Sequence, residues 1–506
     1  MRVLFIYPNL NAQIGFNYGV GYLSSFLKSH GHETGLLNIN DRLGYDFDLE
    51  RILADVRAFE PDLIGFSVVT NQYSYTKKIA EALRKETRVP LAIGGVHATM
   101  APEETLKTGL FDFLCVGEGE LAMVELADSL DNGGDVSRIR NVWHYDSGKI
   151  YRNPVRPFIS LEKIPPIDYS IFNFQKMIDA KGGWVGVMAS RGCPFRCNYC
   201  FNHRIVDIYR RDTGVNIRDL HYLRQYPIEM VIEDLQRLLK TYRNIKMFIF
   251  DDDLFTMNRD YVFEFCRHYR NAIDVPFVCN AHVRVFDEEI ARSLSEAGCA
   301  IVKFGLESGS DRIRRKVLNR PMRNEDIIHA FKMADKYGIH TSAFVMIGLP
   351  HETVDDLMMT IKLLGTIKPG RFRWSIFFPF IGTKAYDIAK DGGFIDWEKM
   401  ENLTNFTDES CLDFGDEQNL LIDKLAKTYP WFVNAETDFP SASLYEKLTR
   451  MVLAMDRENW EKVKGGMRGL DSDISDALLS SKTPHYSIRF NPFMGVRDDW
   501  LERGED

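Results

Sequence analysis

Short apolar runs alternate with amphipathic segments, first over residues 1–130 and again from residue 184 onward. Alternation of this kind is typical of βα units, and a row of such units forms a parallel sheet covered by helices. In the first series we expect helices at 20–29 and 73–87 and strands at 3–7, 35–39, 63–69, 91–94 and 113–116. The sequence therefore predicts an α/β fold that begins with a doubly wound domain.

The second series predicts helices at 227–242 and 324–337 and strands at 184–189, 247–250, 277–280, 301–305, 341–347 and 373–378. Six βα repeats are typical of a partial or complete barrel of the TIM type. Before this series, the proline-marked stretch 131–180 reads as a linker with a hairpin around Ser147. We expect four parts, 1–130, 131–180, 181–384 and 385–506. The last is mainly helical, either a lid or substrate-shaping domain or a structural cap.

Composition limits the class of protein. With 63 basic and 72 acidic residues the formal net charge is -9, so no strongly cationic surface indicates a nucleic-acid partner. The chain shows neither the pattern of a secretory signal nor an apolar run of about 18 residues that could form a transmembrane segment. Eight cysteines in 506 residues are too few for a disulfide-stapled secreted protein, which favours a reducing, cytoplasmic setting.

Three cysteines crowd into the stretch SRGCPFRCNYC, directly after the first strand of the second series. They are Cys193, Cys197 and Cys200. Three thiolates on one tight loop can hold three irons of a cubane 4Fe–4S cluster and leave one iron open, whereas a structural zinc needs a fourth ligand. A zinc site completed by a remote histidine is the rival interpretation. The other cysteines are isolated and are expected to be buried and structural: Cys115, Cys266, Cys279, Cys299 and Cys411.

The CxxxCxxC spacing, with Tyr199 before the last cysteine, resembles the radical S-adenosylmethionine (SAM) enzymes over residues 180–380. The resemblance implies that the cysteines hold a 4Fe–4S cluster whose open iron binds the amino and carboxylate groups of SAM. It also implies that the reduced cluster cleaves the sulfonium to give a 5'-deoxyadenosyl radical. A one-electron reductant such as flavodoxin or ferredoxin would then be a partner.

Residues at successive strand ends extend this resemblance. The SAM-binding residues that it implies are Tyr199, Asp251, Asp252, Asp253, Arg284, Glu307, Ser308 and Ile347. The aspartates would accept from the ammonium, Glu307 from the ribose hydroxyls, and Arg284 would pair with the carboxylate. Each acidic residue alone is more readily explained as a helix cap or a solvated charge. Their shared position at strand ends favours the binding role for the aspartates and Glu307.

The first domain, joined to such a barrel by a proline-marked linker, resembles the Rossmann-like domain of the cobalamin-binding subfamily of radical SAM enzymes. The motifs are SVVT at 67–70, GGVHAT at 94–99 and VGEGE at 116–120. The fingerprint GxGxxG is absent, which argues against a dinucleotide. The cobalamin-binding residues that the resemblance implies are Asn9, Ser67, Val69, Gly94, Gly95, Val96, His97, Gly117 and Glu118.

One departure concerns the cobalt. Cobalamin domains of the methionine synthase type carry Asp-x-His-x-x-Gly after the first strand, whereas residues 8–15 of this chain read PNLNAQIG without a histidine. The resemblance then implies cobalamin with its nucleotide tail inserted and no histidine on the lower face of the cobalt. His97 is either a neighbour of the corrin or a loop histidine bonded to backbone, and the sequence leaves both open.

The resemblance implies a methyltransferase acting on an unactivated carbon of a small molecule or biosynthetic intermediate. One SAM would methylate cob(I)alamin, a second would give the radical that abstracts hydrogen, and the substrate radical would take methyl from methylcobalamin. The alternative keeps the cofactors but performs cyclisation, ring rearrangement or oxidation. A zinc-bound or apo regulatory binding protein leaves the carboxylates at the strand ends unexplained. A methylthiotransferase is disfavoured because no second cysteine triplet is present.

Overall fold

The computed structural model describes residues 1–146, 148–403 and 409–501. These residues fall into two compact units. The first comprises Met1–Phe195, Cys200–Lys246 and Phe380–Thr383, and the second comprises Arg196–Tyr199, Met247–Pro379 and Lys384–Asp506. Ser147, at the tip of the predicted hairpin, lies outside the described residues.

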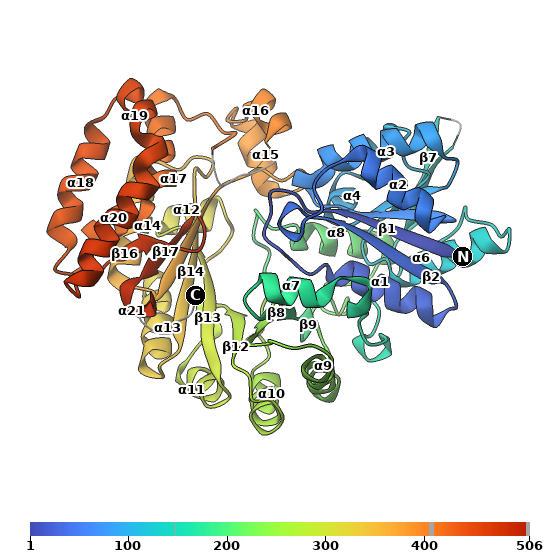
Figure 1. Ribbon diagram of the computed structural model, residues 1–506, viewed down its shortest axis with the longest axis horizontal. Coiled ribbons are helices and arrows are strands. Elements are labelled where there is room, and N and C mark those ends of the chain that lie inside the picture. Colours follow the sequence, from blue (N-terminus) through green and yellow to red (C-terminus); the bar gives the residue numbers. More distant parts are fainter. Residues whose placement is uncertain (147, 404–408, 502–506) are drawn as a thin grey trace. The chain divides into compact units, whose positions relative to one another are not determined.

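The first unit contains a sheet with the strand order β2-β1-β3-β4-β5-β6-β7 (Figure 1). Its strands are β1 (Arg2–Pro8), β2 (Glu33–Ile39), β3 (Leu63–Ser67), β4 (Leu91–Gly94), β5 (Phe113–Cys115), β6 (Val142–Asp146) and β7 (Lys149–Tyr151). Strands β1 to β5 are parallel, in an order that flavodoxin-like doubly wound sheets share. The antiparallel hairpin β6–β7 extends the edge at β5. The predicted doubly wound sheet is confirmed.

The apolar runs become strands because helices cover a parallel sheet on both faces. In β1, Val3, Leu4, Phe5 and Ile6 are at most 2% exposed. The helices of this part are α1 (Tyr18–Ser29), α2 (Leu49–Phe59), α3 (Tyr73–Glu86), α4 (Val96–Met100), α5 (Pro102–Lys107) and α6 (Glu120–Asp131). Polar side chains cap two of them, since Asn17 accepts from the first turn of α1 and Asp48 from that of α2.

The remainder of the first unit leads to and from the cysteine motif. Its elements are α7 (Phe174–Ala180), β8 (Trp184–Val187), β9 (Ser190–Arg191), α8 (Asn202–Thr213), β10 (Arg224–Gln225) and α9 (Ile228–Thr241). β9 and β10 pair antiparallel, immediately before Gly192 and the first cysteine. The motif therefore starts from a fixed piece of backbone.

In the second unit, parallel strands follow one another in chain order from β11 to β15. They are β11 (Met247–Phe250), β12 (Phe277–Ala281), β13 (Cys299–Glu307), β14 (His340–Ile347) and β15 (Arg371–Ile376). The intervening helices are α10 (Arg259–Ala272), α11 (Glu288–Glu296), α12 (Asp311–Lys316), α13 (Asn324–Lys336) and α14 (Val354–Ile367). Aromatic contacts such as Phe250–Phe265 and Phe304–Phe331 pack these helices on one face of the sheet. The predicted βα series is confirmed.

The C-terminal part is mainly helical, as predicted. It contains α15 (Lys384–Asp391), α16 (Trp397–Asn402), α17 (Asp416–Ala435), α18 (Ala442–Ala454), α19 (Arg457–Val463), α20 (Met467–Ser480) and α21 (Asp498–Leu501). Helices α17, α18 and α20 pack side by side in Figure 1. Two strands were not predicted, β16 (Tyr486–Ile488) and β17 (Met494–Arg497). β17 pairs antiparallel with β15, and β16 pairs antiparallel with β17.

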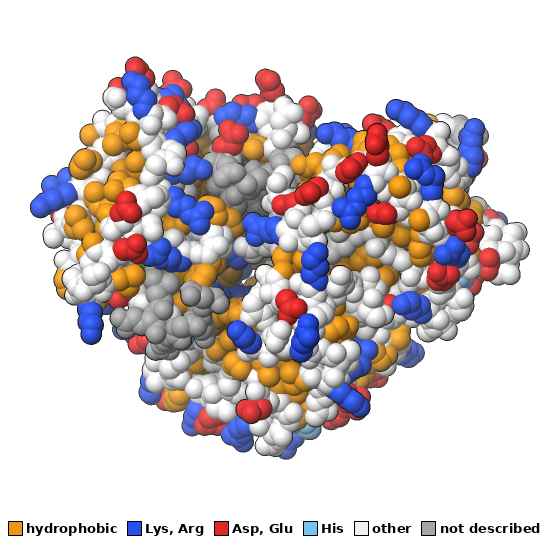
Figure 2. Space-filling model, viewed as in Figure 1, with side chains coloured by type: hydrophobic (Ala, Val, Ile, Leu, Met, Phe, Trp, Pro, Cys, Tyr) orange, Lys and Arg blue, Asp and Glu red, His pale blue; other side chains and the backbone are white. Residues whose placement is uncertain are grey.

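On the face drawn in Figure 2, lysine and arginine side chains are interspersed with aspartate and glutamate side chains. Within the described part of the chain, every helix is too short or too polar to span a bilayer.

Candidate functional site

The carboxyl ends of β3, β4 and β5 border a cavity of about 290 Å³ within the first unit. Ligands of doubly wound sheets bind at this edge, because the helices that follow the strands leave a crevice there. Part of the cobalamin-binding set predicted from the sequence lines the cavity: Ser67, Gly94, Gly95, Gly117 and Glu118.

The cavity has the chemistry of a site for the aromatic base that ends the nucleotide tail of cobalamin. Tyr22, Phe66 and Met123 supply apolar wall, and the glycines bring backbone up to the cavity. Asn17 donates its amide to the Ser67 hydroxyl at 3.0 Å, which leaves the Ser67 proton free to be donated to a ligand. Gly95 is required, because its φ is +93° and a Cβ there would lie 2.7 Å from the Val68 carbonyl oxygen.

The other predicted cobalamin residues do not line this cavity. Asn9 donates its amide to the Gln13 carbonyl at 3.4 Å, Val69 is exposed, and Val96 begins α4. His97 is buried, and its ring stacks on Tyr73 with the centroids 3.9 Å apart. Burial, with a smaller effect of Lys77, lowers the pKa of His97 to about 4, so the ring is neutral near pH 7. The Nδ1 atom of His97 lies 3.4 Å from the Thr70 hydroxyl.

Charged side chains meet beside the cavity. Arg191 donates to Glu120 at 2.6 Å and to Glu118 at 3.4 Å, and Arg224 donates to Glu118 at 3.1 Å. Burial alone would raise the pKa of Glu118, but the hydrogen bond and charge of Arg224 and the charge of Arg191 outweigh it and lower the pKa. Because Arg191 directly precedes the cysteine loop, these ion pairs tie that loop to the cavity wall.

We expect Arg191→Met to destabilise the first unit by about 3 kcal/mol, because it leaves a buried glutamate without its cation. The Glu120 side chain is only 7% exposed. The matched control is Arg57→Met. Arg57 forms a surface ion pair with Glu86, so this substitution should change the free energy of unfolding by less than about 1 kcal/mol. Urea unfolding followed by circular dichroism measures both, and equal losses would contradict the structural role of Arg191.

The cysteine loop begins at a turn that only glycine permits. Gly192 has a φ of +90°, and a Cβ there would lie 2.3 Å from the Tyr222 carbonyl oxygen. At the other end, the Cys200 sulfur accepts from the Asn202 backbone at 3.5 Å, and the Tyr222 hydroxyl donates to the Asn202 side chain at 2.7 Å. Tyr222 therefore supports the start and the end of the loop.

The middle of the loop belongs to the second unit and is held there by backbone contacts and by an arginine. Asn198 donates to the carbonyl oxygens of Leu318 at 2.9 Å and Val317 at 2.8 Å. Arg320 donates to the Cys197 sulfur at 3.4 Å and to the Gly305 carbonyl oxygen at 2.7 Å. Arg320 therefore links the Cys197 sulfur to the end of β13. Arg320 was not predicted, because its contact with Cys197 joins residues more than a hundred positions apart and no local sequence pattern indicates such a contact.

Tyr199 and Glu307, predicted to share one site, are in contact. The Tyr199 hydroxyl donates to Glu307 Oε1 at 2.9 Å. Burial raises the pKa of Glu307, against the opposing effects of Arg320 and of this hydrogen bond. Glu307 has a φ of +66° at a register shift at the end of β13. A left-handed backbone at a non-glycine residue is strained, and such residues cluster at functional sites.

In the parts of the chain that the structure describes, the three motif cysteines form no disulfide, and the five predicted structural cysteines are buried. Among the described residues, no three His, Cys, Asp or Glu side chains are arranged to hold one metal ion. In a cubane, each cysteine binds a different iron, so the sulfurs need not converge on one point. Three cysteines on a glycine-shaped loop, with Arg320 beside one of them, fit a 4Fe–4S cluster.

The remaining predicted SAM residues follow strand ends in different surroundings. Asp251 and Asp253 are exposed after β11, whereas Asp252 is buried and its carbonyl oxygen accepts from Asn280 at 2.7 Å. Arg284 is exposed on the turn after β12, beside a groove that Asp326 also lines.

Two further predicted SAM residues are fully buried. The Ser308 hydroxyl lies 3.3 Å from that of Thr360 and accepts from the Ser310 backbone at 3.2 Å. Ile347 ends β14. These contacts make Ser308 part of the scaffold behind Glu307.

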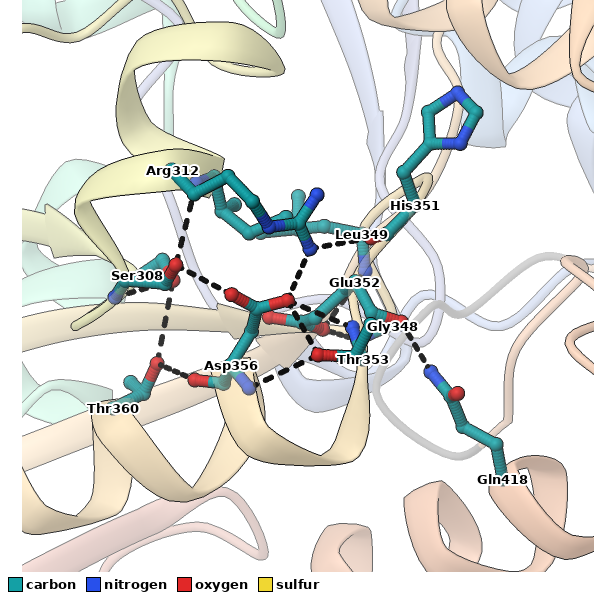
Figure 3. A network of polar contacts seen from close by, with 12 residues as sticks. Ser308, Arg312, Gly348, Leu349, His351, Glu352, Thr353, Asp356, Thr360 and Gln418 are labelled. Carbon is teal, nitrogen blue, oxygen red and sulfur yellow. Dashed lines mark hydrogen bonds and ion pairs between the residues drawn. The ribbon is translucent and has the colours of Figure 1, made fainter.

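Glu352, which was not predicted, holds the loop after Ile347 (Figure 3). Its Oε2 accepts from the backbone of Gly348 at 2.7 Å and of Leu349 at 3.1 Å. Gln418 of α17 donates to the Glu352 carbonyl oxygen at 2.6 Å. Glu352 is 2% exposed, and burial raises its pKa to about 8.

A carboxyl with a raised pKa makes stability depend on pH. The unfolded chain loses this proton near the ordinary value of 4.5 and the folded chain near 8, so stability falls as pH rises between the two. Glu352→Gln removes this dependence. Relative to wild type, the free energy of unfolding of the variant should therefore increase by on the order of 3 kcal/mol as the pH is raised from about 5 to 8. Urea unfolding at both pH values tests this, and a constant difference would contradict the buried, protonated Glu352.

Two family models match the chain, the radical SAM superfamily over residues 187–364 and the B12 binding domain over residues 12–127. An uncharacterized methyltransferase of Pyrococcus horikoshii is 29% identical over 432 residues, which cover 81% of this chain and 89% of the relative. The anaerobic magnesium-protoporphyrin IX monomethyl ester cyclase of Rubrivivax gelatinosus is 25% identical over 451 residues, 85% of this chain and 77% of the cyclase.

A solved structure shares the fold. It is the cobalamin-dependent SAM radical enzyme OxsB with aqua-cobalamin bound, with a TM-score of 0.67 at 15% identity, covering 95% of this chain and 75% of OxsB. The two family models match separate parts of this chain. The chain belongs to the cobalamin-dependent radical SAM enzymes, whose cofactors are a 4Fe–4S cluster, S-adenosylmethionine and cobalamin.

Proposed function

We propose that this chain is a methyltransferase that transfers a methyl group to an unactivated carbon of a small-molecule substrate. The observation that carries the proposal is the combination, in one chain, of a glycine-lined cavity suited to the cobalamin tail and a cysteine loop suited to a 4Fe–4S cluster. The methyltransferase relative, matched over 89% of its length, supports it.

In this proposal the cluster is held by Cys193, Cys197 and Cys200. When bound, the cluster and SAM supply an organic radical, and cobalamin supplies the methyl group. Arg320 donates to the Cys197 sulfur, and its second hydrogen bond fixes the guanidinium against β13. A one-electron reductant such as flavodoxin or ferredoxin supplies electrons from outside the chain.

Glu307 and Tyr199 act as a pair toward SAM. Glu307 Oε1 accepts from Tyr199, which leaves Oε2 to accept from ribose hydroxyls. Asp251, Asp252 and Asp253 follow β11 and would meet the ammonium. In the first unit, Ser67 donates its hydroxyl proton to the cobalamin tail, and the glycine backbone sets how closely the tail approaches the sheet.

The coproducts of SAM distinguish the two reactions. Methyl transfer should give S-adenosylhomocysteine and 5'-deoxyadenosine in equal amounts, with the product heavier than the substrate by one methylene. The reconstituted enzyme is incubated with cobalamin, reductant, methyl-labelled SAM and a panel of metabolites, and the products are analysed by mass spectrometry. A converted substrate that carries no label, with 5'-deoxyadenosine as the only nucleoside coproduct, would exclude methyl transfer.

The second candidate is a radical cyclisation, rearrangement or oxidation with the same cofactors. The cyclase relative supports it, since it matches 85% of this chain. This alternative predicts an unlabelled product, with its mass unchanged after a rearrangement or lowered by the loss of hydrogen after an oxidation.

A further inference from the structure

The sheet of the second unit has one face packed on helices and one partly open face. In β15 every second residue is buried and the others are partly exposed, and β13 and β14 end with the same alternation. The open face carries cations at its centre: Lys303 on β13, and Arg371 and Arg373 on β15. Basic side chains in the middle of a sheet are costly to desolvate, which calls for a compensating partner.

Among these cations, Arg373 is the clearest case of a partly buried positive charge without an acidic partner among the described residues. Its guanidinium carbon lies 5.6 Å from the ring centroid of Phe344 and 5.0 Å from that of Phe493. Within the described parts of the chain, the Arg373 guanidinium takes part in no hydrogen bond or ion pair. Burial lowers the pKa of Arg373, and no acidic group acts against this. Its fork of donors thus lies near two aromatic rings, with no carboxylate of the described residues paired to it.

Lys303 and Arg371 lie in one row across the sheet. Lys303 is in register with Ser342, and Ser342 with Arg371, so the three side chains share a face. Arg371 donates to the Ser342 hydroxyl at 3.3 Å. Burial lowers the pKa of Lys303 to about 8, although the charge of Asp251 acts in the opposite direction. Arg373 follows Arg371 by two residues, which keeps it on the same face.

The cations lie next to the candidate SAM residues. A Cβ on Gly305 would lie 2.4 Å from Glu307 Oε1 and 3.0 Å from Arg320 Nη2, so Gly305 faces that cluster. Gly305 is in register with Phe344, and Phe344 with Arg373. Lys303 precedes Gly305 by two residues, about 7 Å along the strand. A small molecule anchored at these cations would therefore reach the Glu307 cluster.

We propose that this open face binds an acidic group of the substrate, a carboxylate or a phosphate, with Arg373 as the main partner and Lys303 as the second. Arginine between aromatic rings suits planar, two-pronged recognition of such groups. The inference rests on the proposed function only in that the bound molecule is taken to be its substrate. Anion binding itself requires no turnover.

The test uses inorganic phosphate and succinate as probes. Both are titrated by calorimetry into the cofactor-loaded enzyme at constant ionic strength. We expect wild type to bind one of them and Arg373→Met to bind it about tenfold or more weakly, because charged hydrogen bonds are lost. Arg373→Lys should fall between the two, since it keeps the charge but loses the fork. Phosphate binding alone indicates a phosphorylated substrate, and succinate binding alone a carboxylate.

The matched control is Arg450→Met, which removes an exposed arginine of α18 paired with Glu446 and should leave binding unchanged. Iron content and circular dichroism show whether each variant is folded. If Arg373→Met does not fold, Lys303→Met replaces it, with a smaller expected loss. No binding of either probe to wild type, or equal binding by the variants, overturns the proposal. Neither result depends on whether the enzyme transfers methyl groups.

Discussion

Cys197→Ala is expected to remove the 4Fe–4S cluster and abolish SAM cleavage. Each cysteine of the motif would hold its own iron, so the loss of one thiolate leaves the cubane without a protein ligand at that corner. Cys197 is also the cysteine whose sulfur accepts from Arg320. Iron and sulfide analysis of anaerobically reconstituted protein should fall from about four irons per chain to near zero. 5'-Deoxyadenosine formation should fall with it.

The control is Cys266→Ala, which removes a buried cysteine of α10 outside the motif. It should keep its iron and its SAM cleavage, with only a modest loss of stability from the smaller side chain. A full iron complement in Cys197→Ala, or an equal loss in both variants, would contradict the assignment of the cluster to the CxxxCxxC loop.

Gly94→Val is expected to abolish cobalamin binding while the cluster is retained. Gly94 lies in β4 and lines the cavity of the first unit. Its backbone tolerates a side chain, because an added Cβ would meet only Cys115, at 3.6 Å from its Cβ, and valine is favoured in strands. The added methyl groups would occupy space that the cobalamin tail needs. Cobalt analysis and the absorption spectrum of protein purified with cobalamin measure the loss.

The control is Gly465→Val, at a glycine where an added Cβ meets nothing within 4 Å. It should bind cobalamin as wild type does. Full cobalt content in Gly94→Val would show that the cavity at β3, β4 and β5 is not the cobalamin site. Loss of iron together with cobalt would instead indicate that the variant is misfolded.

Local sequence patterns predicted the elements that long apolar runs create. Strands such as β1, β3 and β12 bury runs of consecutive residues, and β15 buries every second residue, so a short window of sequence contains their signal. β16 and β17 are only three and four residues long, and they form because β15 offers an open edge. The sequence around β16 and β17 gives no information about this edge, because a distant part of the chain provides it.

The residues of the candidate site also fall into two groups, those that the local sequence predicts and those that it does not. The position of Glu307 at a strand end could be predicted from the sequence, and Tyr199, predicted for the same site, donates to it. Arg320 and Glu352 could not be predicted, because their roles depend on where a loop returns after folding. His97 also follows a strand end, yet its ring packs on Tyr73. Strand order indicates which loops meet, whereas side-chain direction depends on the packing of each loop.

Combined metal and label analysis of the wild-type enzyme tests methyl transfer through cobalamin. The protein is purified anaerobically with cobalamin and incubated with reductant, substrate candidates and methyl-labelled SAM. We expect about four irons and close to one cobalt per chain. We also expect a labelled methyl group in the product and equal amounts of S-adenosylhomocysteine and 5'-deoxyadenosine. Iron without cobalt, or conversion of a substrate without label, would contradict methyl transfer through cobalamin.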